Sequence, residues 1–401
     1  MRSITNRVRA ASLVAFAVGA AILLTGAAES SRANNPNNKQ ATINDEIRDK
    51  TVRKGIDWLL SVQGKDGGWG QDGGETSYVR QGERLETGGN DVANTAVALL
   101  ALAHNGSTPS TGPHREAARR GVEFILRSVE NSPEETLAVT KVTGTQIQRK
   151  LGPFIDTFLT SMLLSELDGT LTADQRLNTR VRVSLQKCVR KIQKAQMADG
   201  SWNISGGWAP ILGTSMASRS LDNARQKGVV IDQAVAARVD KYTKDTQEKM
   251  AKASDPATRM GRGAYGVAAE AGSPVAVYAD AQALEQLSRT EGDRRANASK
   301  IRAIQNKLSD TGYVDGFGSM GGEEFFSYLN ISESMHRAGG PEWQKWNGDM
   351  RKKLVALQNN DGTWAGHHCI TGRVAVTGAA VLTLVADRDP ISGPVQQGQA
   401  R

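Results

Sequence analysis

One pattern, Q-x-x-D-G-[GST]-W, occurs three times in the chain and constrains its fold more than any other feature. The copies run from Gln63 to Trp69, from Gln196 to Trp202 and from Gln358 to Trp364. Each copy follows a stretch with helical apolar spacing and precedes another stretch rich in Ala, Leu and Val. Because Asp favours turns and Gly tolerates the positive φ that ends a helix, each Asp-Gly pair predicts a break between two helices. The repeating unit is therefore a helical hairpin, and a repeat of this kind decides the architecture.

A fourth copy keeps only the first half of the repeat. The segment 120–125 (RGVEFI) matches 54–59 (KGIDWL) in type at its charged, glycine, aromatic and aliphatic positions. Lys187 lies about twice as far from Lys54 as Arg120 does, so a repeating unit of roughly 60 residues fits the chain.

Apolar spacing, together with Gly and Pro breaks, predicts twelve helices. They are expected near residues 46–63, 91–104, 114–128, 154–167, 173–196, 213–227, 229–252, 274–288, 293–309, 322–337, 341–358 and 371–386. Twelve helices in six hairpins predict an all-α fold, a closed (α/α)6 toroid. The polar helices are expected outside, and the Ala-rich and Gly-rich helices inside, where crowding at the axis favours small side chains. Closure would also cover the hairpin faces that an open solenoid must cap.

The first 28 residues have the parts of a secretory signal peptide. Arg2, Arg7 and Arg9 precede an apolar run from Ala11 to Leu24, and small residues follow at 26–28. We therefore expect residues 1–28 to be a signal peptide that is removed, which exports the protein to the periplasm or the extracellular space. An uncleaved membrane anchor is the less favoured alternative, since spanning a bilayer needs roughly 20 apolar residues. Contact with a membrane is expected only through this segment.

The rest of the chain divides by composition. Residues 29–44 are polar and aperiodic and are predicted to be a flexible leader, residues 45–386 form the toroid domain, and residues 387–401 are predicted to be a disordered tail. The net charge of +8 falls to roughly +5 without the signal peptide, too little to indicate a nucleic-acid partner. Only two cysteines occur, Cys188 and Cys369, so disulfides do not build the fold, and whether these two pair stays open.

The first copy of the repeat fits the complete QW motif, [K/R]-[G/A]-x-x-[FYW]-[LIV]-x-x-x-Q-x-x-x-G-x-W. The matching residues are Lys54, Gly55, Trp58, Leu59, Gln63, Gly67 and Trp69. In this the chain resembles the squalene and hopene cyclases and, more loosely, the β subunits of protein prenyltransferases. The resemblance implies that each Gln amide stacks on its Trp and bonds to helix ends, which makes the Gln and Trp residues of all three copies structural.

The catalytic motifs of these families are absent from the sequence. The chain has no Asp-x-Asp-Asp run for protonating squalene, no Asp-x-Cys pair for the zinc of prenyltransferases, and no Asp-Asp-x-x-Asp magnesium motif. Aromatic residues, whose ring faces stabilise carbocations, make up only 5% of the chain. Triterpene cyclases use two helical barrels and this chain has room for one, so we do not expect it to cyclise triterpenes.

Four polar residues near the expected starts of inner helices are the candidates for catalysis: Asp91, Asp156, Glu324 and His368. In rings of this kind a cavity opens at one end, lined by inner-helix ends. Two of the carboxylates could face each other there as acid and base, the arrangement of glycan-cleaving helical barrels. Alternatively, the acids cap the free N–H groups of the helices and suit the helix dipole.

The run His367-His368-Cys369 could ligate zinc together with an Asp or Glu. Adjacent residues seldom point to one ion, however, and no second Cys or His lies nearby in the sequence. We therefore predict no metal site and no cofactor.

Three functions stay open. The first is a terpenoid cyclase-like or prenyltransferase-like protein that acts on or binds an isoprenoid or other lipid. The second is an exported polysaccharide lyase or hydrolase on the same ring. The third is a non-catalytic binding or scaffolding toroid. The expected partner is a small hydrophobic or glycan ligand in the central cavity.

Overall fold

The computed structural model describes residues 36–71, 89–204, 210–254, 274–310, 314 and 321–388. The chain divides into two compact units, residues 1–51 and 52–401, and the arrangement below is that of the second unit. Within the described residues every regular element is a helix, and the only β-type pairing is an isolated bridge between Trp69 and Asp91. The prediction of an all-α fold is confirmed for this part of the chain.

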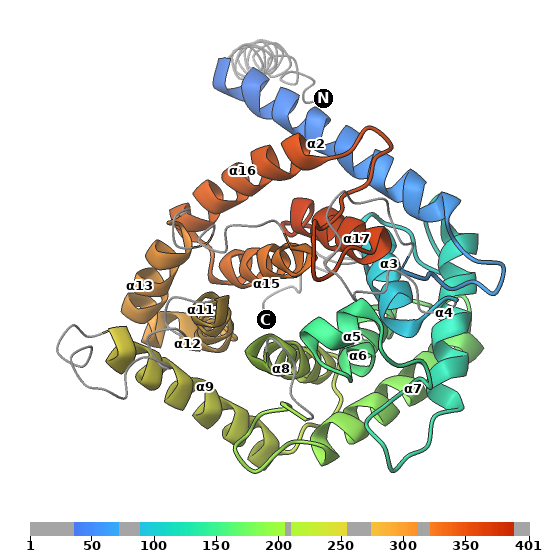
Figure 1. The fold of residues 1–401 in the computed structure, drawn as a ribbon, viewed down its shortest axis with the longest axis horizontal. Helices are drawn as coiled ribbons and strands as arrows, with labels where there is room; N and C mark the ends of the chain where they lie inside the picture. The colour runs from blue at the N-terminus through green and yellow to red at the C-terminus, as the bar shows by residue number, and fades with distance from the viewer. Residues whose placement is uncertain are drawn as a thin grey trace, which may run out of the picture. The chain divides into compact units, whose positions relative to one another are not determined.

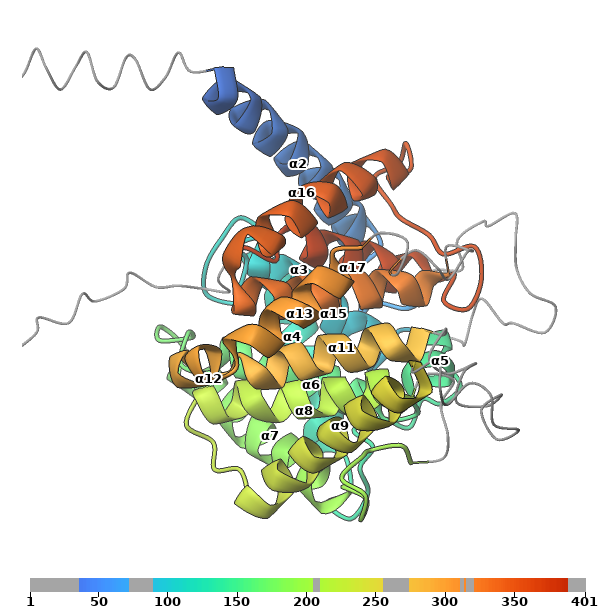
Figure 2. The ribbon, with the colours of Figure 1, turned by 90° about the vertical axis from the view of Figure 1, so that its left-hand side faces the viewer.

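Six of the described helices form an inner set. They are α3 (Val92–His104), α6 (Ile155–Leu167), α8 (Pro210–Gln226), α11 (Pro274–Leu287), α15 (Gly322–Ala338) and α17 (Arg373–Leu384). Each packs against the next in chain order, and α17 packs against α3, so the contacts close into a circuit (Figure 1). Figure 2 shows α6, α8 and α11 side by side along one flank of this circuit. A closed circuit of inner helices is consistent with the predicted toroid of helical hairpins.

The remaining long helices lie outside the inner set. They are the end of α2 (Pro36–Ser61), α4 (Arg115–Glu130), α7 (Gln175–Lys194), α9 (Gln233–Ser254), α13 (Ala298–Leu308) and α16 (Gly340–Leu357). Helix α4 buries a single apolar face, whereas α3 is buried at every residue from Val92 to Ala103. A helix that is apolar on all sides belongs inside a core. The Ala-rich and Gly-rich stretches are therefore inner helices, as predicted.

Each tryptophan of the repeat ties an outer helix to the inner helix that follows it. The indole N–H of Trp69 donates to the carbonyl of Leu59 at 2.6 Å, and the same bond joins Trp202 to Ile192 at 2.7 Å and Trp364 to Leu354 at 2.8 Å. The backbone N–H of each tryptophan donates to a threonine hydroxyl in the next inner helix. These threonines are Thr95, Thr214 and Thr377. The repeat thus satisfies the backbone groups at a helix end and at the following helix start.

The glutamines of the first two copies join their turns to the next outer helix. The Gln63 amide donates to the carbonyls of Gly67 at 2.8 Å and Ala117 at 2.9 Å. The amide of Gln196 makes the equivalent pair of bonds, to Gly200 in its own turn and to Val235 in α9. In the third copy, a Cβ added to Gly362 would lie 2.6 Å from the carbonyl oxygen of Lys54. The last turn therefore packs on the first outer helix, which closes the outer set as α17 and α3 close the inner one.

Two of the predicted helices differ most from those observed. Helix α2 begins at Pro36, so residues 36–44, predicted as part of the flexible leader, are helical. A helix is recognised in a sequence by the apolar spacing of its buried face, and residues 36–44 contain too few apolar residues to show such a spacing. The helix expected over 293–309 is divided into α12 (Glu291–Ala296) and α13 at Asn297, whose side chain donates to the carbonyl of Asp293 and ends the first helix.

A short helix, α5 (Gln146–Leu151), was not predicted. It is opened by a reciprocal cap in which Thr145 and Gln148 bond to each other's backbone N–H groups. The predicted signal peptide (1–28), the first part of the leader and the tail from residue 389 lie outside the described residues. None of the described helices combines the length and the hydropathy that a bilayer crossing requires. No disulfide joins Cys188 to Cys369, and both side chains are buried.

Candidate functional site

Three of the four predicted residues, Asp91, Asp156 and Glu324, lie at the starts of inner helices, and His368 lies in the loop before α17. Asp91 is the N-cap of α3 and is 1% exposed. Its carboxylate accepts the backbone N–H of Asn94 at 2.9 Å and the Asn94 side-chain amide at 2.8 Å. Asp156, also 1% exposed, stands in the first turn of α6.

Asp156 joins three helices at this end. One carboxylate oxygen accepts the backbone N–H of Ala93 in α3 at 3.1 Å, and the other accepts the Gln148 amide of α5 at 2.7 Å. Burial raises the pKa of Asp91 to about 6 and that of Asp156 to about 7, and the negative charge of Asp91 adds to the shift of Asp156. The pair is therefore engaged in capping helices, and this arrangement favours the capping interpretation over an acid and base facing a cavity mouth.

Glu324 also serves the start of its own helix. Its carboxylate accepts the backbone N–H of Gly321 at 3.4 Å and the hydroxyl of Tyr328 at 3.3 Å. Burial raises the pKa of Glu324. The Lys353 ammonium donates to the same tyrosine hydroxyl at 2.9 Å. Hydrogen bonds thus link Lys353, Tyr328 and Glu324 and hold the Glu324 side chain in place.

His368 belongs to a different cluster, which forms between the starts of α15 and α17. Its Nδ1 lies 3.0 Å from Sγ of Cys369 and 4.0 Å from a carboxylate oxygen of Glu323. One ligand atom from each of the three residues lies within 4.8 Å of the other two, and all three residues are buried. The second carboxylate oxygen of Glu323 is buried and makes no hydrogen bond within the described residues.

Local backbone geometry brings the three side chains together. The backbone N–H of Gly322 donates to the carbonyl of His368 at 3.2 Å, which joins the start of α15 to the loop before α17. Gly322 has no space for a Cβ, because the backbone of Ile370 occupies it. Cys369 has φ of 65°, the only positive value among the described non-glycine residues, and this turn lets adjacent side chains converge.

The cluster carries a donor set suited to a transition metal. Thiolate, imidazole and carboxylate are the ligand types of zinc sites, and three protein ligands leave one tetrahedral position open. The sequence prediction of no metal site did not include Glu323 beside His368, because the two residues are far apart in the chain. Only the packing of α15 against α17 makes them neighbours. The exposed His367 lies outside the cluster.

Comparison with known proteins agrees with the repeat analysis. Residues 38–151 match the squalene–hopene cyclase C-terminal domain. A segment covering 20% of the chain is 40% identical to the squalene–hopene cyclase of Bradyrhizobium diazoefficiens, and one covering 21% is 38% identical to the lanosterol synthase of Saccharomyces cerevisiae. A probable squalene–hopene cyclase of Sinorhizobium fredii is 35% identical over 20% of the chain.

In its repeats and in these matched segments the chain is similar to the terpenoid cyclase-like superfamily. The matched segments span about a tenth of the length of each relative, 10% or 11%. The family resemblance recognised in the QW repeats is therefore confirmed.

Proposed function

We propose that this protein is an exported, terpenoid cyclase-like helical ring that binds one zinc ion through Glu323, His368 and Cys369. The observation that carries the proposal is the convergence of a thiol, an imidazole and a carboxylate, all buried and within 4.8 Å of one another. A buried carboxylate oxygen without a hydrogen bond costs free energy, and a metal ion supplies the missing partner.

The spacing of the three groups is compatible with zinc. Bonds of about 2.0 to 2.3 Å in tetrahedral geometry place ligand atoms roughly 3.3 to 3.7 Å apart. The separations of 3.0 Å and 4.0 Å around Nδ1 of His368 fall on either side of this range, so small side-chain rotations would complete the site. When bound, zinc with an open position supplies a Lewis acid that lowers the pKa of a coordinated water.

Tyr278 lies beside this cluster and is available as a proton-bearing partner. Burial raises the pKa of its hydroxyl, and the negative groups of Glu323, Glu324 and Cys369 add to the shift. The hydroxyl accepts from Ser327 at 2.8 Å, and its raised pKa keeps it protonated at neutral pH.

The test is metal content. We expect purified protein to contain about one zinc per chain, and Glu323→Gln, His368→Ala and Cys369→Ser each to remove most of it. His367→Ala and Cys188→Ser should keep full occupancy, since His367 is exposed and Cys188 lies in α7. Elemental analysis gives the stoichiometry, and cobalt substitution shows a thiolate charge-transfer band only when Cys369 is a ligand.

Two outcomes would contradict the zinc site. One is wild-type protein that neither retains zinc nor takes it up after dialysis against zinc. The other is equal loss of metal in the His367→Ala control. Chelation of the wild-type protein provides a check that does not depend on variants folding, because removal of the ion should lower the melting temperature and added zinc should restore it.

Export is proposed from the first 28 residues alone. Sequencing the N-terminus of protein recovered from the producing organism should locate a cleavage near Ala28. An intact N-terminus in a membrane fraction would instead support the uncleaved anchor.

A second candidate function, binding of an isoprenoid, is favoured by the names of the matched relatives. Retention of a polyprenyl ligand through purification, detected by mass spectrometry of an organic extract, would support it.

A further inference from the structure

The loop before α17 carries two residues of the candidate metal cluster, and a glutamine from a distant part of the chain holds this loop. Gln146 is the first residue of α5 and is 1% exposed. Its side-chain oxygen accepts the backbone N–H groups of Thr371 and Gly372, both at 2.9 Å. Its side-chain amide donates to the hydroxyl of Thr371 at 2.8 Å. One side chain therefore fixes two consecutive residues of the loop, shortly after Cys369.

Gln146 is itself held in place by the first repeat. Its backbone N–H donates to the side-chain oxygen of Gln71 at 2.6 Å. A Cβ added to Gly372 would lie 2.6 Å from the backbone carbonyl oxygen of the same glutamine. The first repeat, α5 and the loop before α17 therefore meet around the buried Gln146 amide, and hydrogen bonds in several directions give that amide one orientation.

The other side of the loop is held by α15. The backbone N–H of Gly322 donates to the carbonyl of His368 at 3.2 Å, and a Cβ added to Gly366 would collide with the Gly322 nitrogen. Cys369 lies between this contact and the contacts of Gln146. Its φ of 65° is a conformation that a non-glycine residue keeps only when its surroundings impose it. The two contacts together supply that constraint.

We propose that Gln146 is a positioning residue for the zinc site, and this inference rests on the zinc site proposed above. Gln146 holds the loop in the strained turn that directs Cys369 and His368 toward Glu323. Ligands that are arranged before the ion arrives bind it more tightly, because the loop need not be ordered on binding. Without the Gln146 side chain, Cys369 can leave its positive φ, and its thiol then moves away from the His368 imidazole.

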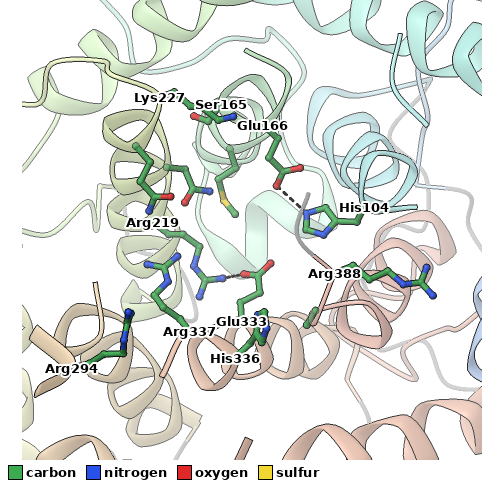
Figure 3. A pocket seen from close by; sticks show the side chains of 14 residues that line it. His104, Ser165, Glu166, Arg219, Lys227, Arg294, Glu333, His336, Arg337 and Arg388 are labelled. Carbon is green, nitrogen blue, oxygen red and sulfur yellow. Dashed lines mark hydrogen bonds and ion pairs between the residues drawn. The ribbon is translucent and has the colours of Figure 1, made fainter. Parts of the chain in front are cut away.

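Other contacts hold the inner helices at their opposite end, so loss of the Gln146 side chain should act locally. A hollow of about 400 Å³ lies at that end, and buried charges of its lining are paired. His104 of α3 pairs with Glu166 of α6 at 3.0 Å, and Arg219 of α8 pairs with Glu333 of α15 (Figure 3). These ion pairs join inner helices independently of α5.

The first test is zinc affinity, measured by competition with a chromophoric chelator. Gln146→Ala is expected to weaken zinc binding by about tenfold, the lower end of the usual effect of residues that orient metal ligands. Gln146→Glu keeps an acceptor for both backbone N–H groups and should recover most of the affinity. Gln305→Ala is the matched control, because it removes another buried glutamine, whose amide donates to the Gly339 carbonyl at 2.7 Å. This control should bind zinc as tightly as wild type.

The second test follows the loop in metal-free protein. Cys369 and Cys188 are both buried, so iodoacetamide modifies each thiol only when its surroundings open. Gln146→Ala is expected to raise the labelling rate of Cys369 by about tenfold and to leave that of Cys188 unchanged. Mass spectrometry of the peptides resolves the two sites. A general loss of stability would instead raise both rates.

The inference is overturned if Gln146→Ala binds zinc as tightly as wild type, or if Gln305→Ala weakens zinc binding as much as Gln146→Ala does. Equal labelling rates of Cys369 in wild type and Gln146→Ala would also contradict it. Wild-type protein that binds no zinc would end the proposed zinc site, whereas the labelling of Cys369 would still decide whether Gln146 holds the loop. Failure of one proposal is thus distinguishable from failure of the other.

Discussion

Replacing Trp69 with alanine is expected to lower the free energy of unfolding by about 3 to 5 kcal/mol, the usual cost of removing a large buried aromatic side chain. Trp69 is fully buried, and its indole N–H donates to the Leu59 carbonyl at the end of an outer helix. The variant therefore loses packing, leaves a cavity and removes a hydrogen bond to the Leu59 carbonyl. Urea denaturation followed by circular dichroism measures the change.

Trp58 gives a matched comparison. It belongs to the same helical hairpin but is only half-buried, with Arg373 above its ring at 5.0 Å. Trp58→Ala is expected to cost about 1 to 2 kcal/mol, mostly through partial loss of buried area and of the cation–π contact. Equal costs at the two positions would mean that the repeat tryptophan has no special structural role.

Trp69→Phe divides the effect into its parts. An aromatic ring remains and the indole donor is lost, so a smaller cost of about 1 to 3 kcal/mol is expected from the lost hydrogen bond to the Leu59 carbonyl and the missing second ring. The Trp69 ring also lies against Gly121 of the next outer helix, where a Cβ would come within 2.8 Å of it. This contact links neighbouring hairpins, so the melting transition of Trp69→Ala should shift as a whole.

The fold was predictable because a strong local pattern recurs and because each recurrence has one physical meaning. The Asp-Gly pair at Asp66 and Gly67 lies in the turn that follows the helix ending at Ser61, with φ of 92° at Gly67, and Trp69 then bonds back to that helix. The burial of α3 on all sides was predictable because nearly all of its residues are small or apolar. The break at Asn297 was missed because a capping side chain acted within an otherwise helical pattern.

The site was only partly predictable. Asp91 and Asp156 were identified as polar residues at inner-helix starts, and the sequence allowed both a catalytic and a capping interpretation; contacts with Asn94 and Ala93 favour the second. Glu323 became a neighbour of His368 only through the packing of two inner helices. His104 and Glu166 had no sequence signal, because a lone histidine and a lone acid at helix ends are ordinary surface features until the helices converge.

The burial of Asp91 and Asp156 predicts that neutral pH destabilises this end of the ring. Both pKa values are higher in the folded chain, about 6 and about 7, than the ordinary aspartate value of 3.8. Between the ordinary value and these raised values the folded state therefore binds more protons than the unfolded state. The free energy of unfolding falls as the pH rises through this range. At about 1.4 kcal/mol per pKa unit, Asp156 alone accounts for about 4 kcal/mol between pH 4 and pH 8.

Asp156→Asn removes this titration and isolates its contribution. The asparagine oxygen can still accept the Ala93 N–H, but its amide meets the Gln148 donor, so the variant is expected to be less stable than wild type near pH 4. The difference should shrink or reverse toward pH 8, because only the wild type must ionise a buried carboxyl. Urea denaturation of both proteins at intervals from pH 4 to pH 8 measures the difference between their free energies of unfolding. The contributions of all other titrating groups cancel in this difference, because both proteins contain them.

Asp174 supplies a control of opposite sign. It caps α7 through the Leu177 N–H and pairs with Arg119 at 2.7 Å, and these contacts lower its pKa. A lowered carboxyl pKa stabilises the fold above the unfolded value and is lost as the pH falls, so Asp174→Asn should lose its disadvantage in acid rather than toward pH 8. If Asp156→Asn and Asp174→Asn shift the pH profile in the same direction, the buried pair does not hold protons in the folded chain.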